Sequence, residues 1–232
     1  MSLFSCEKIP KRPLRGRPAK GAPSGKVSLL AAATKAFSGL GFDRADLRSI
    51  ATAAGVSPNL VRIHFGSKVA LWDACLDEIV KITAVPVAEV AQLSQATDRP
   101  VRDRVVEAIG KIANLYTRHP EVRAFVSLHL VEAPERAAQL TQKLLHPAFE
   151  ALRPLLEEAM SKGVIAPAHP AIVFGLINSA VSAPPSFPGL ITQIAPELDS
   201  LTARQTLLQT FISLLLQKPA GPEGHGEGTL HD

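Results

Sequence analysis

The stretch LRSIATAAGVSPNLVRIHFGSK, residues 47–68, carries the clearest structural signal in the chain. Asp46 precedes it as a candidate helix cap, and Gly55 stands where a helix end needs left-handed backbone dihedrals. Ser57 and Pro58 then have the residue types that cap and begin a second helix. The first helix has one apolar face, made by Leu47, Ile50, Ala51 and Ala54 at helical spacing. The stretch therefore predicts two short helices joined by a tight turn.

The second of these helices has an inner and an outer side. Val61 and Phe65 are four residues apart, so both point toward the same small core. The residues on or beside the outer side are Asn59, Leu60, Arg62, Ile63 and His64. This mixture suits the edges of DNA bases, thymine methyl groups and phosphates. The alternative is a helical hairpin whose outer face is simply solvated.

Charge is distributed unevenly along the chain. Residues 1–71 contain 12 Lys or Arg and 3 Asp or Glu, whereas residues 72–232 contain 13 and 18. The first part is thus strongly basic and the second is acidic, although the whole chain carries only +4. Such asymmetry is typical of a nucleic-acid-binding end joined to an effector end.

The basic residues of segment 1–25 alternate with prolines, and the segment has too few apolar residues to form a core. We expect it to be a disordered basic arm. The sequence RGRP, residues 15–18, resembles the core of an AT-hook, in which two guanidinium groups enter a narrow A·T-rich minor groove. Arg15 and Arg17 would supply those groups. The alternative is a flexible tail attracted to phosphates.

The region from Val27 to Leu76 contains a series of motifs: Ala36-Phe37, Gly39-Leu40-Gly41-Phe42, Ile50-Ala51, Ala54-Gly55-Val56-Ser57 and His64-Phe65-Gly66-Ser67-Lys68. With these motifs the region resembles the TetR family of bacterial transcriptional regulators. The chain departs from the family pattern at Asn59-Leu60-Val61-Arg62, where many relatives have Gly-Thr-Leu-Tyr. An operator sequence therefore cannot be transferred from relatives.

The resemblance implies a DNA-binding role for particular positions. Arg48, Asn59, Leu60 and Arg62 would contact bases or flanking phosphates, and His64 and Lys68 would hold the DNA backbone. With the arm included, the expected DNA-binding residues are Arg15, Arg17, Arg48, Ser57, Asn59, Leu60, Arg62, Ile63, His64 and Lys68.

The rest of the chain shows helical patterns separated by Pro and Gly, without a strand pattern. Ser67 is expected to cap a fourth helix that ends before Pro86. Pro147 and Pro154 are expected to kink or break a long helix that Gly163 ends. The later helices are expected at residues 100–118, 122–131, 135–162, 170–183 and 198–217. The fold class is therefore all-α with about nine helices.

Four segments follow from these patterns. Residues 1–25 form the arm, and residues 26–66 form a three-helix helix-turn-helix DNA-binding domain. Residues 67–217 form a helical effector-binding and dimerisation domain, and residues 218–232 form a disordered tail rich in turn-forming residues.

The last two helices are apolar on nearly all sides, so each needs more than one partner. The simplest second partner is the same helix pair of another subunit, and TetR proteins dimerise in this way. The alternative is a core helix in a monomer. The expected dimer interface comprises Phe174, Ile177, Val181, Leu208, Phe211, Ile212 and Leu215.

Regulators of this family are generally repressors that release DNA when a small molecule occupies a cavity in the C-terminal domain. The candidate ligand-binding residues are Tyr116, His119, Phe125, Leu128, His129, Phe149, Leu152, Phe174 and Asn178. A mostly apolar lining suits a hydrophobic or amphipathic ligand. The alternative for each residue is ordinary core packing.

The remaining sequence features argue against other classes of protein. The chain shows no metal-ligand spacing, nucleophile elbow or phosphate-binding Gly loop, so we expect neither an enzyme nor a cofactor. Two cysteines and the lack of a long apolar run favour a cytoplasmic protein with no membrane contact. The sequence thus predicts a homodimeric repressor of an inverted-repeat operator. It leaves open a regulator controlled by a protein partner, or an activator, without a small-molecule ligand.

Overall fold

The computed structural model describes residues 25–182 and 186–217, and this part of the chain is helical apart from an isolated bridge between Ile165 and Leu216. Three helices form the N-terminal end: α1 (Gly25–Arg44), α2 (Leu47–Ala53) and α3 (Asn59–Phe65). The others are α4 (Lys68–Gln95), α5 (Val101–Arg118), α6 (Pro120–Glu132), α7 (Pro134–Leu140), the π-helical η1 (Thr141–Leu145), α8 (His146–Ser161), α9 (Pro170–Val181), α10 (Ser186–Ile194) and α11 (Ser200–Leu215). The all-α fold expected from the sequence is confirmed.

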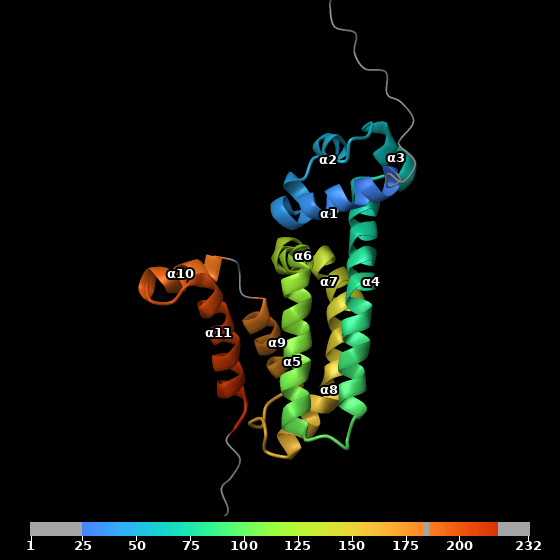
Figure 1. Cartoon of the computed structure of the whole chain (residues 1–232). Helices are drawn as coiled ribbons and strands as arrows, with labels where there is room; N and C mark the ends of the chain where they lie inside the picture. Colours follow the sequence, from blue (N-terminus) through green and yellow to red (C-terminus); the bar gives the residue numbers. More distant parts are fainter. Residues whose placement is uncertain (1–24, 183–185, 218–232) are drawn as a thin grey trace, which may run out of the picture.

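The N-terminal helices lie across one end of a bundle of longer helices (Figure 1). Helix α4 begins beside α3 and runs the length of the bundle, and α5 returns beside it. Helix α11 lies outside the bundle next to α9, and α10 packs against α11. The arm at residues 1–24 and the tail at residues 218–232 lie outside the described residues.

The caps expected around the two short helices are present. The Asp46 carboxylate accepts a hydrogen bond from the Ser49 N–H at 2.8 Å, which caps α2. Gly55 has a φ of 68°, so the left-handed turn is confirmed. Pro58 has helical dihedrals at the start of α3, and the Ser57 hydroxyl accepts from the Asn59 N–H at 3.3 Å. Local backbone chemistry thus favours the tight turn between α2 and α3.

Helix α4 is longer than the sequence indicated. We expected it to end before Pro86, but it continues through this proline to Gln95, and the expectation was wrong. Thr83, Val90 and Leu93, on both sides of the proline, are buried against the bundle. Their burial outweighs the cost of about 3 kcal/mol for a proline inside a helix.

The two prolines expected to interrupt the segment 135–162 act differently. Pro147 lies in the first turn of α8, directly after η1, so the regular helix is interrupted there as expected. Pro154 lies inside α8, which continues to Ser161. Gly163 has a φ of 67° and follows the helix end, as expected. Helix α10 was not expected, because its sequence SFPG has turn-forming residue types.

One buried ion pair joins α5 to α8 near the C-terminal end of α4. The Arg104 side chain is fully buried and its Nη2 lies 2.6 Å from the Glu158 carboxylate. Arg104 also donates to the carbonyls of Arg99 and Leu93. These bonds lower the pKa of Glu158, with the Arg104 hydrogen bond as the main cause and Lys162 as the second. Arg104 therefore joins the α4–α5 connection to α8.

A second set of contacts joins the N-terminal helices to the bundle. The carboxylate of Glu132, at the end of α6, accepts the Phe42 N–H with both oxygens at 3.0 and 3.1 Å. Gly41 turns the end of α1 toward this carboxylate with a φ of 81°, and a Cβ at that position would collide with Glu132 Oε1. The guanidinium of Arg136, from α7, covers the Phe42 ring at 4.0 Å. The end of α1 is therefore fixed to α6 and α7.

The same carboxylate is tied to α4 through a histidine. Trp72 Nε1 lies 3.2 Å from His129 Nε2, and His129 Nδ1 lies 2.6 Å from Glu132. An indole N–H can only donate, so Nε2 accepts and the proton of a neutral imidazole resides on Nδ1. Burial lowers the pKa of His129, which favours this neutral form. Helices α1, α4 and α6 thus meet at one hydrogen-bonded chain.

The Arg104–Glu158 pair yields a stability prediction. Arg104→Ala should lower the free energy of unfolding by about 3 kcal/mol, because it removes the buried partner of a carboxylate. Glu158 has a lowered folded pKa, so its contribution is present above its ordinary pKa of 4.5 and is lost as pH falls through the folded pKa. Urea denaturation between pH 7 and pH 3 should show a flatter acid dependence in the variant. Arg153→Ala, which removes an exposed pair with Glu150, is the control and should leave stability nearly unchanged.

The junction at Gly41 yields a second prediction. Gly41→Ala should destabilise the protein by about 2 kcal/mol or more, because the new Cβ meets Glu132 and the backbone φ is unfavourable for alanine. Gly39→Ala is a matched control in the same helix, where nothing lies within 4 Å of a new Cβ. The control should be neutral or slightly stabilising. Equal thermal denaturation midpoints for the two variants would contradict the role given to the junction.

Candidate DNA-binding surface and candidate ligand cavity

The outer side of α3 is open to solvent. Asn59, Arg62, Ile63 and His64 are exposed, and Ile63 keeps 64% of its surface accessible. Within the described residues, the side chains of Asn59 and Arg62 make no ion pair or hydrogen bond. An amide, a guanidinium, an imidazole and an apolar group therefore stand side by side on a short helix at one end of the molecule.

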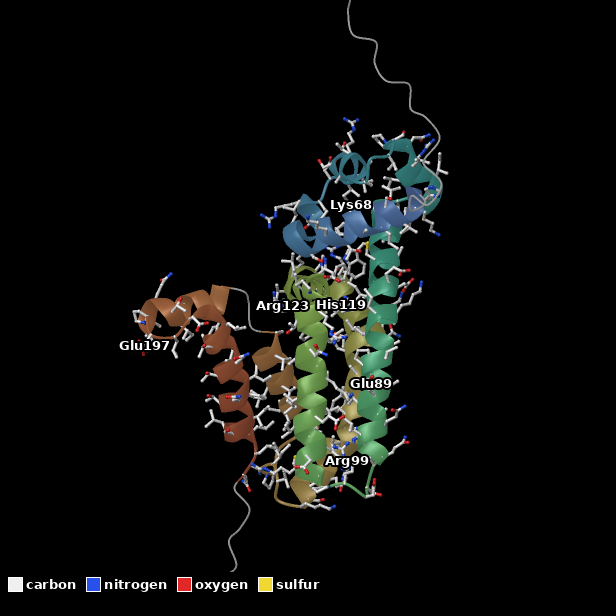
Figure 2. The ribbon with its side chains drawn as sticks, in the orientation of Figure 1. Lys68, Glu89, Arg99, His119, Arg123 and Glu197 are labelled. Atoms are coloured by element: carbon white, nitrogen blue, oxygen red, sulfur yellow. The ribbon has the colours of Figure 1, made fainter. Side chains whose placement is uncertain are left out.

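Other residues of the expected DNA-binding set have different surroundings. Arg48, on α2, is exposed, whereas Leu60 is half-buried and packs against the core of the N-terminal helices. Lys68, labelled in Figure 2, donates to the Asp43 carbonyl at 3.1 Å and lies 4.8 Å from the Phe42 ring. Its ammonium group thus binds the end of α1 in this structure. Ser57 caps α3, and Arg15 and Arg17 lie outside the described residues.

An inner cavity lies among α4, α5, α8 and α9, with a volume of about 50 Å³. Three of the expected ligand-binding residues line it, Tyr116, Phe174 and Asn178. Its other walls include Thr83 and Pro86 of α4. The sequence did not indicate either residue, and the helix was expected to end before Pro86. The apolar residues after Pro86 were the feature of the sequence that could have indicated a longer helix.

The polar groups of this inner cavity satisfy one another. The Tyr116 hydroxyl lies 3.3 Å from Asn178 Oδ1, and Asn178 Nδ2 donates to the Phe174 carbonyl at 3.0 Å. The Thr83 hydroxyl donates to the Val80 carbonyl. Burial raises the pKa of Tyr116 to about 12, so the phenol is neutral. The inner cavity is therefore an uncharged, mostly apolar space.

Most other residues expected at a ligand site have packing roles. Phe125 stacks on Trp72, with ring centroids 5.5 Å apart, and His129 belongs to the junction with α1. Leu152 is buried in the core, and Phe149 packs edge-on against Phe174. These four residues do not line the inner cavity. Leu128 is half-buried on α6, also away from it.

An outer cleft of about 380 Å³ opens on the other side of the same helices. Its walls hold His119, from the expected ligand set, together with Glu89 and Lys111, which form an ion pair at 3.0 Å. Figure 2 labels Glu89 and His119. Arg118 also lines the cleft.

The expected dimer interface divides into two groups. Ile177 and Val181 are buried inside the chain's own bundle, so they are not available to a second subunit, and we correct the expectation for these two. Phe174, Leu208, Phe211, Ile212 and Leu215 are partly buried. The most exposed apolar residues of α9 are instead Ile172 and Leu176, at 61% and 53%. Helical spacing predicted that α9 and α11 are apolar, but it did not predict which of their apolar residues pack inside the chain's own bundle.

The described part of the chain holds neither a membrane-spanning helix nor a cluster of metal-binding side chains. No helix there is long and apolar enough to cross a membrane. No group of three His, Cys, Asp or Glu side chains gathers there in a way that could hold a metal ion. Cys75 is buried beside α1, and burial raises its pKa to about 12.

Comparisons with known proteins agree with this geometry. The family described as "Bacterial regulatory proteins, tetR family" matches residues 29–75. The HTH-type transcriptional repressor BdcR of Escherichia coli (strain K12) is 32% identical over 104 residues, which cover 45% of this chain and 49% of BdcR. The match thus spans only about half the length of that relative.

Solved structures of other regulators share the fold. HlyIIR, a hemolysin II transcriptional regulator, is similar with a TM-score of 0.64 and 18% identity, over 84% of this chain and 98% of HlyIIR. A transcriptional regulator of the TetR/AcrR family from Thermobifida fusca has a TM-score of 0.52 and 17% identity, over 81% and 96% of the two chains. Residues 29–75 of this chain thus match the TetR family of bacterial regulatory proteins, and the chain shares its fold with solved structures of regulators that include a member of the TetR/AcrR family.

Proposed function

We propose that this chain is a sequence-specific DNA-binding transcriptional regulator, in which residues 26–66 bind DNA and residues 67–217 dimerise and respond to an effector. The observation that carries the proposal is the outer side of α3, where Asn59, Arg62, Ile63 and His64 are exposed after a tight turn. The basic charge of residues 1–71 supports it.

On DNA, α3 enters the major groove and α2 crosses the backbone. Asn59 is suited to adenine and Arg62 to guanine, and Ile63 can cover a thymine methyl group. Arg48 and His64 are placed to contact phosphates. Lys68 reaches DNA only by leaving the Asp43 carbonyl, so we assign it a secondary role in backbone contact. Leu60 contributes mainly by holding α3 against α1.

The regulator acts as a homodimer through α9 and α11. Ile172 and Leu176 of α9 give an exposed apolar stripe beside α11, as a two-fold helical interface requires. Two recognition helices then read an inverted repeat, with half-sites about one helical turn, roughly 34 Å, apart or a multiple of it. Binding of the dimer represses the adjacent gene.

A small hydrophobic or amphipathic ligand releases the repressor from DNA. The inner cavity is lined by α4, and the same helix begins beside α3, so one element contacts both sites. At about 50 Å³ the cavity is smaller than the roughly 300–1,000 Å³ of most ligand sites, so binding must widen it. This small volume is also the observation that favours the second candidate, a regulator or activator controlled by a protein partner.

The proposal predicts that the purified protein enriches an inverted repeat from genomic fragments at physiological salt. Arg62→Ala should weaken binding to that repeat by about 1–3 kcal/mol, and discrimination should be lost at one base pair of each half-site. Fluorescence anisotropy with matched and mutated operators measures both effects. Arg153→Ala, on α8, is the control and should bind like the wild type. Enrichment without a shared motif would contradict sequence-specific regulation.

The dimer proposal predicts that Leu176→Glu gives monomers. A charge in a buried interface lacks a partner, whereas on the free surface of α9 it is tolerated. Val131→Glu, on α6, is the control, because Val131 is 80% exposed and lies away from α9. Light scattering after size exclusion measures the mass of both variants. A dimeric Leu176→Glu variant would place the interface elsewhere.

A further inference from the structure

The inner cavity and the outer cleft share two wall residues, Pro86 of α4 and Leu115 of α5. Both side chains are half-buried. They form the partition between the small apolar inner cavity and the larger, more polar outer cleft. A molecule that displaces these two side chains could therefore occupy both spaces at once.

The cleft is built from two facing stripes of helix. On α4 the wall residues are Ile82, Val85, Pro86 and Glu89. On α5 they are Lys111, Asn114, Leu115 and Arg118. Each set has the spacing i, i+3, i+4, i+7, which places its members along one side of a helix. The cleft is therefore a groove between two neighbouring helices, with the partition in its floor.

The two spaces differ in charge. The inner cavity contains only neutral groups that already bond to one another, so it can accept an apolar part of a ligand but not a charge. In the cleft, Glu89 and Lys111 neutralise each other, and His119 faces Glu121 at 3.1 Å. Arg118 makes no ion pair or hydrogen bond within the described residues, so it is the charge of the cleft that remains available.

We propose that the effector is an amphipathic carboxylate whose carboxylate binds Arg118 in the outer cleft and whose apolar chain passes Pro86 and Leu115 into the inner cavity. A guanidinium is well suited to a carboxylate, because its donors can form two parallel hydrogen bonds. Asn114, between Lys111 and Arg118, offers a further amide donor. This inference rests on the proposed function, since it names the ligand class of that regulator.

Three eight-carbon probes separate the contributions of charge and chain. Octanoate, octan-1-ol and octylamine are titrated into the full-length protein by calorimetry. Octanoate should bind most tightly, octan-1-ol more weakly and octylamine most weakly. Arg118→Ala should weaken octanoate binding about fivefold and leave octan-1-ol unchanged, because Arg118 meets only the charged end. Arg153→Ala removes an exposed arginine from α8 and should leave all three affinities unchanged.

A second variant tests the route into the inner cavity. Leu115→Trp enlarges the partition and should weaken octanoate and octan-1-ol alike, and circular dichroism checks that it remains folded. Equal binding of the three probes, or an octanoate affinity that is unaffected by Arg118→Ala, overturns the proposal. Absence of binding by all three probes also overturns it.

DNA binding is measured on the same samples, so that this inference and the proposed function can fail separately. Arg118 is the last residue of α5, whereas α3 packs against α1, α2 and α4, and Arg118→Ala should bind the enriched DNA like the wild type. Specific DNA binding without octanoate binding would refute the ligand class alone. Octanoate binding with the expected variant effects but without DNA binding would refute the regulator alone.

Discussion

The position of the N-terminal helices depends on the carboxylate of Glu132. Both of its oxygens accept the Phe42 N–H, and His129 donates to it from the same helix. Protein N–H groups take the place of water around this carboxylate. They hold it strongly, because hydrogen bonds to a charged acceptor are about twice as strong as those between neutral groups. Gly41 is required beside it, since both its φ and the space left by Glu132 exclude a side chain. This contact fixes how α1, and with it α2 and α3, sit on the bundle.

Helix α4 connects these contacts around Glu132 with the inner cavity and the outer cleft. Trp72 of α4 donates to His129, and Thr83 and Pro86, farther along the same helix, line the inner cavity. At its far end α4 is held by Arg104, which binds the Leu93 carbonyl, and by Ser94, which donates to the Ala151 carbonyl. One continuous helix therefore contacts the N-terminal helices, lines the inner cavity and packs against α8. Such an element can transmit a change between sites only if it has two arrangements.

Sequence patterns predicted the features that depend on neighbouring residues. Local backbone chemistry predicts the Asp46 cap, the Gly55 turn and the start of α3 at Pro58. The motifs between Ala36 and Lys68 indicated the resemblance to the TetR family. Patterns failed where distant contacts decide the outcome. Pro86 predicts a helix end, but burial of Thr83 and Val90 on either side of it stabilises a continuous α4. Ile177 and Leu176 are equally apolar, and only the packing of α9 shows that one is buried and the other exposed. Phe125 and His129 have the composition of a ligand site, yet they pack around Trp72.

The small inner cavity gives the proposed regulation its energetic basis. A ligand can change DNA affinity only by its different affinity for two arrangements of the chain. At about 50 Å³, the inner cavity is too small for such a ligand in the arrangement described here. Because it must instead widen around Pro86 and Leu115, the ligand favours an arrangement in which α4 and α5 lie farther apart there. The lower end of α4 is held to α8 through Ser94, and its upper end is held to α1 through Lys68 and Asp43. In the proposed regulation, opening at Pro86 moves one end of α4 relative to the other and thereby changes the placement of α3.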